Sequence, residues 1–313
     1  MLVCILTRGF AQSVPQISQL TPPQLWQRLE FSIGDVPSAA NPFDPDVIQL
    51  DARFTLPSGG TTTVPAFWYQ GYQRSLSGGY ESDVQAGSPG WRLRFTPPET
   101  GSYTLSLSIS TNGQLSGGPV STNFSVPAGP LPTRSGYVGI APGRQYFQTG
   151  DGQPLRLIGE NVCWGDGPAT YSYDTWFAAM QSAGENYARI WMSPWEFGIE
   201  DTPASLTDYS LEPAWQLDYV LQLAEQRAIY VLLCLDYHGM FVTQPDPTWG
   251  GNNYWPQNPY NTTNGGPCAV ANDFFTNATA RKLYQKRLRY LIARYGYSQN
   301  LRARPRHSWR GTA

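Results

Sequence analysis

The stretch from residue 230 to residue 238 constrains the fold more than any other part of this 313-residue chain. Its letters, YVLLCLDYH, give a mostly apolar run that is followed at once by polar residues. A continuous apolar run of this length is typical of a strand buried on both faces, as in a parallel sheet covered by helices. The preceding segment, 213–227, has apolar residues at helical spacing. We therefore predict a helix and a buried strand whose polar end lies where α/β barrels hold their chemistry.

Strand and helix alternate over the whole of residues 141–300. The predicted elements are a hairpin around 151–152, a strand over 157–164, a helix between Ser172 and Gly184, a strand over 187–192 and a helix over 278–295 whose Arg and Lys face outward. This alternation, with polar residues at the strand ends, is how a (β/α)8 barrel begins. A whole barrel takes about 250 residues. We therefore predict an incomplete TIM barrel, with a fourth strand due at about Asn300.

Residues 20–127 follow a different pattern, with a period of two. Apolar residues alternate with polar ones over 48–56 and again over 103–109. Segments rich in Gly, Ser and Pro, including 75–90, separate such runs and are predicted to be turns. Several short strands with frequent turns predict an immunoglobulin-like β-sandwich. Residues 128–140 then read as a semi-rigid linker, so we predict a multidomain protein that is all-β first and α/β second.

The two ends of the chain depart from these patterns. Residues 1–15 contain a short apolar core and are predicted to be a remnant of a secretion signal, which favours an extracellular or cell-envelope protein. Residues 301–313 contain four arginines, no aliphatic run and no periodicity. We interpret this basic tail as an aberrant end of the chain, and a genuine interaction arm is the alternative.

Composition argues against several partners and cofactors. A net charge of −2 favours neither nucleic acid nor an anionic membrane, and no apolar run approaches the roughly 20 residues of a membrane span. Four cysteines without metal-ligand spacing and two histidines predict no metal centre, and we expect no cofactor. A disulfide between Cys163 and Cys268 is a hypothesis, because both cysteines lie near the ends of predicted elements.

Several motifs together resemble a known family. They are NPFD at 41–44, VPAFWY at 64–69, GENVCW at 159–164, NYARIW at 186–191, NPYNTTNGGPC at 258–268 and the segment 287–298. In this order they resemble secreted clan A glycoside hydrolases of the cellulase-like group, which pair an uncharacterised β-sandwich with a barrel. The resemblance implies a poly- or oligosaccharide partner and a retaining mechanism with two glutamates, at the ends of the fourth and seventh strands. Both positions would lie beyond Ala313, so it also implies that this chain has no catalytic residue and is inactive.

The resemblance also points to residues of a substrate site. Arg189 matches the family's arginine near the nucleophile, and His238 matches its substrate-contacting histidine. An arginine paired with a core carboxylate such as Glu160, and a histidine that caps a loop, are the alternatives. Other candidate contacts, on the face of the barrel where sites gather, are Asn161, Trp164, Trp195, Glu196, Trp249 and Trp255. The tryptophans would offer flat faces to sugar rings, and simple packing is the alternative for each.

Two further hypotheses stay open. Glu160 and Glu196, near the ends of adjacent strands, are an alternative catalytic pair. The alternative function is a non-catalytic carbohydrate-binding or structural protein in which the β-sandwich is the working part. Turnover of aryl glycosides would indicate hydrolysis, whereas retention on insoluble polysaccharide without turnover would favour the binding protein.

Overall fold

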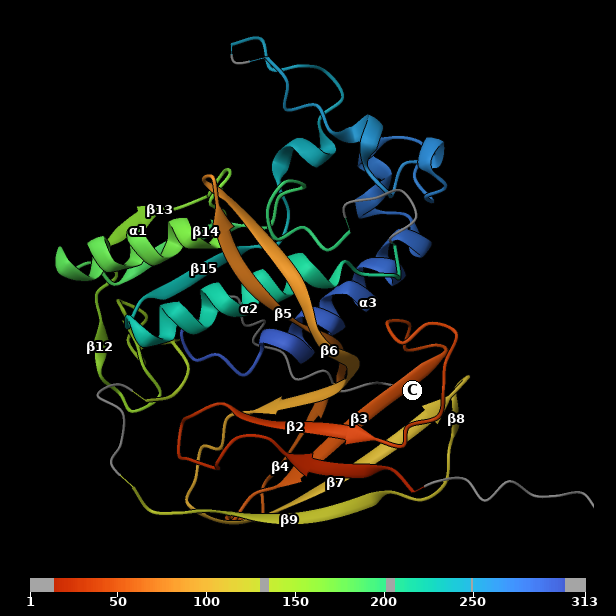
Figure 1. Ribbon diagram of the computed structural model, residues 1–313, viewed down its shortest axis with the longest axis vertical. Coiled ribbons are helices and arrows are strands. Elements are labelled where there is room, and N and C mark those ends of the chain that lie inside the picture. The colour runs from red at the N-terminus through yellow and green to blue at the C-terminus, as the bar shows by residue number, and fades with distance from the viewer. Residues whose placement is uncertain (1–13, 130–134, 201–205, 249, 302–313) are drawn as a thin grey trace, which may run out of the picture.

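The computed structural model describes residues 14–129, 135–200, 206–248 and 250–301. Within these ranges the chain forms a β-rich unit, a small three-stranded sheet, and a unit with a parallel sheet and three α-helices (Figure 1). Residues 1–13 of the predicted signal remnant, residues 302–313 of the basic tail, Trp249 and residues 130–134 of the predicted linker lie outside the described part. No described helix is both long and apolar enough to span a bilayer.

The β-rich unit consists of two antiparallel sheets that pack face to face. One sheet has the order β1 (Gln16–Gln19), β2 (Leu29–Gly34), β6 (Tyr80–Phe95), β5 (Phe67–Ser77). The other has the order β4 (Thr61–Pro65), β3 (Ile48–Thr55), β7 (Gly101–Thr111), β8 (Gln114–Leu115), with β9 (Val120–Val126) also paired to β7. Alternate residues such as Phe31, Phe54 and Leu105 are buried between the sheets, as a period of two predicts. The immunoglobulin-like type of this sandwich stays a prediction.

The segment 75–90, predicted to be turns, instead belongs to a long hairpin. Strands β5 and β6 pair as far as Ser77 and Tyr80, with a register shift between Tyr69 and Gly71. Beyond that shift the hairpin leaves the sandwich and runs alongside the helices of the α/β unit (orange in Figure 1). Most of its side chains in 75–90 are exposed, so no buried face imposed a period of two on the sequence. The prediction of turns there was wrong for that reason.

A small sheet follows the sandwich in the sequence. It contains β10 (Gly139–Ile140), β11 (Phe147–Gln148) and β12 (Pro154–Leu155), all antiparallel. The turn between β11 and β12 holds Asp151 and Gly152, and the Thr149 hydroxyl donates to the Asp151 carboxylate at 2.5 Å. The hairpin predicted at these residues is confirmed.

The α/β unit is built from three strand–helix pairs. Its parallel sheet has the order β13 (Gly159–Asn161), β14 (Tyr187–Trp191), β15 (Tyr230–Cys234), and the strands are followed by α1 (Thr170–Ser182), α2 (Leu211–Gln226) and α3 (Ala278–Tyr295). Core positions such as Ile190, Leu217 and Val231 are fully buried between sheet and helices. Each of these strands and helices was predicted from the sequence, to within a few residues.

After α3 the chain returns to the edge of this sheet. The Val231 N–H donates to the Asn300 carbonyl at 2.7 Å, and Leu301 forms a parallel bridge with Val231. A fourth parallel position thus opens beside β15, where the sequence predicted a fourth strand. The described residues do not show a barrel, so the incomplete TIM barrel stays a prediction.

The long segment between β15 and α3 is ordered by short helical turns. These are η1 (His238–Phe241), η2 (Trp255–Gln257), η3 (Thr262–Asn264) and η4 (Ala271–Phe275). They enclose a small core of their own, which contains Trp255, Tyr260, Cys268 and Phe274. Asn277 caps α3 by accepting from the backbone N–H groups of Thr279 and Ala280.

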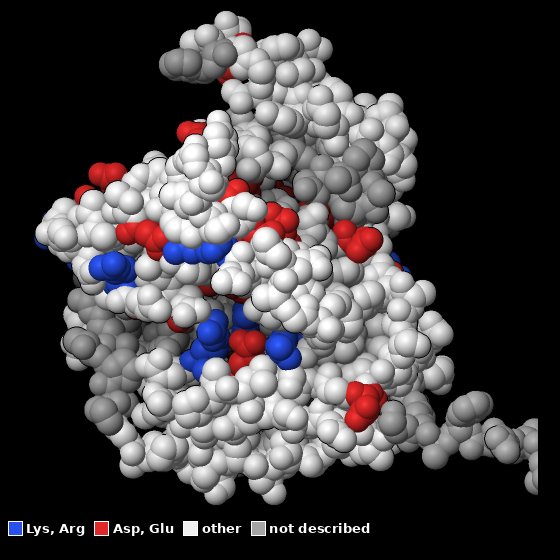
Figure 2. Space-filling view, viewed as in Figure 1, with Lys and Arg blue, Asp and Glu red and all other residues white. Residues whose placement is uncertain are grey.

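Part of the basic face of α3 packs against the sandwich, although the sequence predicted that the whole face would point outward. Arg281 and Lys282 are exposed, as predicted. Arg294 is completely buried, and Lys286 and Arg289 form ion pairs of 2.6 Å with Asp44 and Asp51 of the sandwich. Helical spacing separates a polar from an apolar face but does not show which domain covers the polar one. Figure 2 shows charged side chains gathered in the recess where the sandwich and the α/β unit meet.

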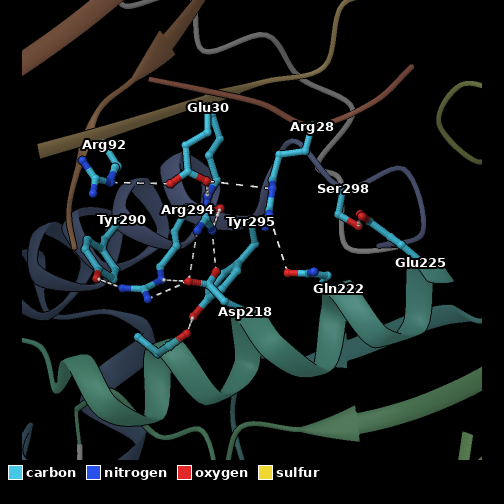
Figure 3. Close-up of polar contacts among 12 residues, drawn as sticks. Arg28, Glu30, Arg92, Asp218, Gln222, Glu225, Tyr290, Arg294, Tyr295 and Ser298 are labelled. Atoms are coloured by element: carbon cyan, nitrogen blue, oxygen red, sulfur yellow. Dashed lines mark hydrogen bonds and ion pairs between the residues drawn. The ribbon is translucent and has the colours of Figure 1, made fainter. Parts of the chain in front are cut away.

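A buried charge cluster joins the two units at this recess. Arg94 of β6 donates to Glu30 at 2.9 Å and to Asp218 of α2 at 2.5 Å. Asp218 also accepts from Arg294 at 2.7 Å (Figure 3). Burial alone would raise the pKa of the Asp218 carboxyl, but the guanidiniums of Arg294 and Arg94 outweigh it and hold that pKa below its usual value. The two arginines and two acids therefore neutralise each other inside the interface.

Candidate functional site

An aromatic cluster lies at the carboxyl ends of the parallel strands. Its members come from four separate segments and are Trp164, Trp191, Trp195, Tyr237, His238 and Tyr254. The ring centroids of Trp164 and Trp195 are 5.6 Å apart, and those of Trp195 and Tyr254 are 5.5 Å apart. Parallel strands bring their carboxyl ends to the same edge of the sheet, which explains why these loops meet.

The outer members of the cluster are accessible to solvent. Trp164 is 38% exposed and Trp195 is 43% exposed, and His238 beside them is also exposed. Tyr237 lies buried beneath, with its ring centroid 4.9 Å from that of Trp195. Contiguous exposed rings on a monomer are typical of a binding surface. Three of the residues predicted as substrate contacts, Trp164, Trp195 and His238, therefore lie together.

Glu196 supports the loop that carries Trp164 and does not face solvent. It is 8% exposed, and its two oxygens accept from the Gly165 N–H at 2.7 Å and from the Tyr173 hydroxyl at 3.0 Å. Burial raises the pKa of this carboxyl, against the opposing effect of those hydrogen bonds. The expectation that Glu196 contacts substrate is corrected accordingly: both oxygens are already used behind the cluster.

Arg189 lies at the edge of the cluster and is partly buried. Its Nε donates to the Cys234 Sγ at 3.2 Å, and its guanidinium lies 4.9 Å from the centroid of the Trp191 ring. Asn161 is exposed beside it in the parallel register, and Glu160 is exposed one position earlier. The alternative of an Arg189–Glu160 ion pair finds no support among the described residues.

The structure corrects two predictions, one about Trp255 as a substrate contact and one about a disulfide between Cys163 and Cys268. Trp255 is only 5% exposed because it packs in the core of the long loop with Tyr260 and Phe274, so it offers no face to a ligand. Cys163 and Cys268 are both free thiols, because Cys268 is fully buried in that same loop core while Cys163 follows β13. The disulfide hypothesis was therefore wrong.

A polar cluster that was missed from the sequence lies next to the aromatic one, around a cavity that Tyr237 also lines. Arg287 of α3 donates to Asp236 at 2.6 Å, and its Nε lies 3.6 Å from a Glu200 oxygen that also accepts from the Tyr260 hydroxyl at 3.3 Å. These residues line a cavity of about 40 Å³, the room of roughly one water. Asp236 ends the predicted strand and so was visible in the sequence, whereas nothing local marks Glu200.

Burial dominates the chemistry of Glu200. It is 8% exposed, and burial raises its pKa to about 8 although the Arg287 charge opposes this. Its other oxygen, Oε1, is buried without a hydrogen-bond partner among the described residues. Next to it a more open hollow of about 460 Å³ is lined by Asp236, His238, Phe275, Arg281 and three further aromatic residues. No three His, Cys, Asp or Glu of the described ranges are grouped as metal ligands would be.

Comparisons with known proteins bear on both units. Residues 23–110, within the sandwich, match a family described as a domain of unknown function, DUF5060. The fold is similar to that of a crystal structure of a putative glycoside hydrolase from Bacteroides vulgatus, with a TM-score of 0.56 and 19% sequence identity. That likeness covers 89% of this chain and 48% of the other, so this chain spans about half the length of the protein it matches.

A second likeness is weaker. A β-glucuronidase from Parabacteroides merdae matches with a TM-score of 0.29 and 12% identity, over 91% of this chain and 28% of the other, which is too weak to carry an argument. No curated protein sequence matches the chain. At these identities the likeness to solved structures establishes the fold and leaves the activity to be argued from the site.

Proposed function

We propose that this chain binds a poly- or oligosaccharide at the aromatic cluster, as part of a protein of the glycoside hydrolase type whose barrel begins at β13. The observation that carries the proposal is the meeting of Trp164, Trp195 and His238, from three different loops, on one exposed surface. Binding sites for small polar ligands combine aromatic walls with a few polar groups, and His238 and Arg189 supply those here. The fold likeness and the order of the strand–helix pairs support the same view.

The described carboxylates favour binding over bond cleavage. A retaining pair needs two carboxyl groups about 5 to 5.5 Å apart that face the glycosidic bond from both sides. Both oxygens of Glu196 are hydrogen-bonded within the protein, and Asp236 is paired with Arg287 and Tyr284. The hypothesis that Glu160 and Glu196 act as a catalytic pair therefore has no support in their geometry. We propose binding without turnover by the described residues.

The alternative function, binding by the sandwich itself, has less support. The sandwich packs its rings against one another in its interior, both stacked and edge-on: Phe31, Phe54, Phe95, Tyr103 and Phe124. Its outer face over β7 and β9 carries Ser and Thr hydroxyls, which bond to one another and to Asn123. Such a face has no flat ring on which a sugar could stack, and binding there is kept as an outcome of the test below.

The test is affinity electrophoresis of the whole chain in native gels cast with soluble xylan, mixed-linkage β-glucan or polygalacturonate. We expect retardation in at least one gel, and a dissociation constant about two- to tenfold weaker for Trp195→Ala, as loss of one aromatic contact predicts. Tyr146→Ala is the matched control, because Tyr146 is 49% exposed but lies beside the β10–β12 sheet. Retardation that Trp195→Ala leaves unchanged would place the binding elsewhere, on the sandwich for example.

A further inference from the structure

The hairpin that leaves the sandwich ends on the loop that presents Trp164. Its tip is formed by Gly78 and Gly79, and the next residue but one, Glu81, donates its backbone N–H to the Gly167 carbonyl at 2.8 Å. Gly167 follows Trp164 by three residues, which span at most about 11 Å of chain. Figure 1 shows the tip of the hairpin, labelled β5 and β6 along its arms, close to the start of α1. The sandwich thus reaches the edge of the candidate site.

Glu81 caps helix α1 from outside the α/β unit. Ala169 at the N-cap position of α1 has no side chain that could accept a hydrogen bond, and the first turn of the helix contains no acidic residue. The Glu81 carboxylate accepts from the Thr170 backbone N–H at 2.5 Å and from the Thr170 hydroxyl at 2.7 Å. A carboxylate at a helix N-terminus satisfies unpaired N–H groups and complements the helix dipole. The cap that α1 lacks in its own sequence therefore comes from the hairpin.

The loop that Glu81 holds is strained. Trp164, Asp166 and Ala169 have φ values of 42°, 48° and 43°, a region that residues with side chains seldom adopt. Such strain persists only where surrounding contacts hold it, and it gathers at functional sites. The contacts here include the Gly165 N–H bond to Glu196 on one side, the Glu81 bonds on the other, and the Ser172 hydroxyl bond to the Gly165 carbonyl. The position of the Trp164 ring thus depends on the hairpin as well as on the α/β unit.

Tyr80 projects from the same tip. It is 71% exposed, and one edge of its ring packs on Gly167, where a Cβ would come within 3.1 Å of the ring and 2.9 Å of the Gly79 carbonyl. The hairpin is fixed in this place by Arg74, which donates to Asp174 at 2.7 Å and lies over the rings of Tyr171 and Tyr219. Tyr80 is thus an exposed ring on a fixed support, and it packs on Gly167 in the same loop that carries Trp164.

We propose that the hairpin tip is the outer edge of the saccharide-binding surface, with Tyr80 as a contact for a sugar ring and Glu81 as the positioning residue for the Trp164 loop. The sandwich then contributes to the site through one arm, and its own faces do not bind the ligand. The inference rests on the proposed function and adds to it a preference for a chain long enough to reach from Trp195 to Tyr80. A short oligosaccharide would use only the aromatic cluster.

The first test uses the same three gels with Tyr80→Ala and Tyr80→Phe. We expect Tyr80→Ala to weaken binding of the polysaccharide about two- to tenfold, and Tyr80→Phe to bind like the wild type, because the ring is kept. The dissociation constant for a disaccharide of the same polymer should be the same for Tyr80→Ala and the wild type, because so short a ligand would use only the aromatic cluster. Wild-type binding by Tyr80→Ala, with weakened binding by Trp195→Ala, would overturn this inference and leave the proposed function standing. No retardation of the wild type would overturn both.

The second test separates positioning by Glu81 from docking of the hairpin as a whole. Glu81→Ala should weaken binding, and Glu81→Gln, which keeps an acceptor for the Thr170 N–H, should restore most of it. Asp83→Ala is the matched control, because Asp83 accepts from Gln216 of α2 at 2.8 Å and lies on the same hairpin away from the loop. Equal weakening by Glu81→Ala and Asp83→Ala would overturn the positioning role. We also expect Glu81→Ala but not Asp83→Ala to change the tryptophan fluorescence, to which Trp164 contributes as one of eleven tryptophans.

Discussion

Replacing Asp218 by Asn should uncouple the sandwich from the α/β unit. Asp218 is 5% exposed and accepts four hydrogen bonds from two guanidiniums, those of Arg94 and Arg294. Asparagine offers one carbonyl oxygen and turns its N–H groups toward the remaining guanidinium N–H groups. The variant would leave two buried arginines with Glu30 as the acid still paired to Arg94. Removing one partner of a buried pair destabilises by about 3 to 5 kcal/mol.

Scanning calorimetry of the whole chain measures this effect. For a unit of 150 to 250 residues, about 3 to 5 kcal/mol corresponds to a fall in Tm of roughly 6 to 20 °C. We also expect the unfolding transition to broaden or split, because the cluster crosses the boundary between the two units. The control is Asp46→Asn, which removes pairs of an exposed carboxylate across the same boundary, with Lys282 at 2.8 Å and with Lys286 at 3.0 Å, while Lys286 keeps its pair with Asp44. An exposed pair contributes less than about 1 kcal/mol. A Tm for Asp218→Asn no lower than that of Asp46→Asn would refute the reasoning.

Three other predictions concern the α/β unit. Burial raises the pKa of Glu200 to about 8, so the folded protein keeps a proton that the unfolded chain releases above about pH 4.5. The free energy of unfolding should therefore fall as the pH rises from about 4.5 to about 8. Glu200→Gln cannot titrate, so its free energy of unfolding relative to the wild type should rise by up to about 1.4 kcal/mol per pH unit between about pH 4.5 and 8. Urea denaturation at several pH values measures this difference. A difference that stays constant with pH would contradict the raised pKa of Glu200. Gly165→Ala should disturb the Trp164 loop and weaken polysaccharide binding in affinity gels, because the new Cβ would lie 2.2 Å from the Ala169 carbonyl oxygen. The control is Gly143→Ala, which should bind like the wild type because nothing lies within 4 Å of its Cβ. Alkylation of the denatured chain without reductant, read by peptide mass spectrometry, should label Cys163, Cys234 and Cys268 fully, and protection of any two would revive the disulfide hypothesis.

The sequence determined the elements whose patterns arise from neighbours along the chain. The apolar run at β15, the helical spacing of α2 and the period of two in β3 and β7 each report a buried face that the segment itself carries. The same local signals placed Trp164, Trp195 and His238 at strand ends, and parallel pairing then brought them together. They also placed the return of the chain to the sheet at Asn300.

Only the tertiary structure determined how polar groups are paired and buried when their partners lie far away in the sequence. Arg94 and Asp218 are 124 positions apart, and neither carries a local sign that the other will neutralise it. Three other features also depend on partners far away in the sequence: the ion pairs of the basic face of α3, the path of the hairpin at 75–90, and the cap that Glu81 gives to α1. Periodicity records which side of a segment avoids water, whereas the pairing of charges and the pKa of a buried carboxyl such as Glu200 depend on what lies opposite once the two units have packed together.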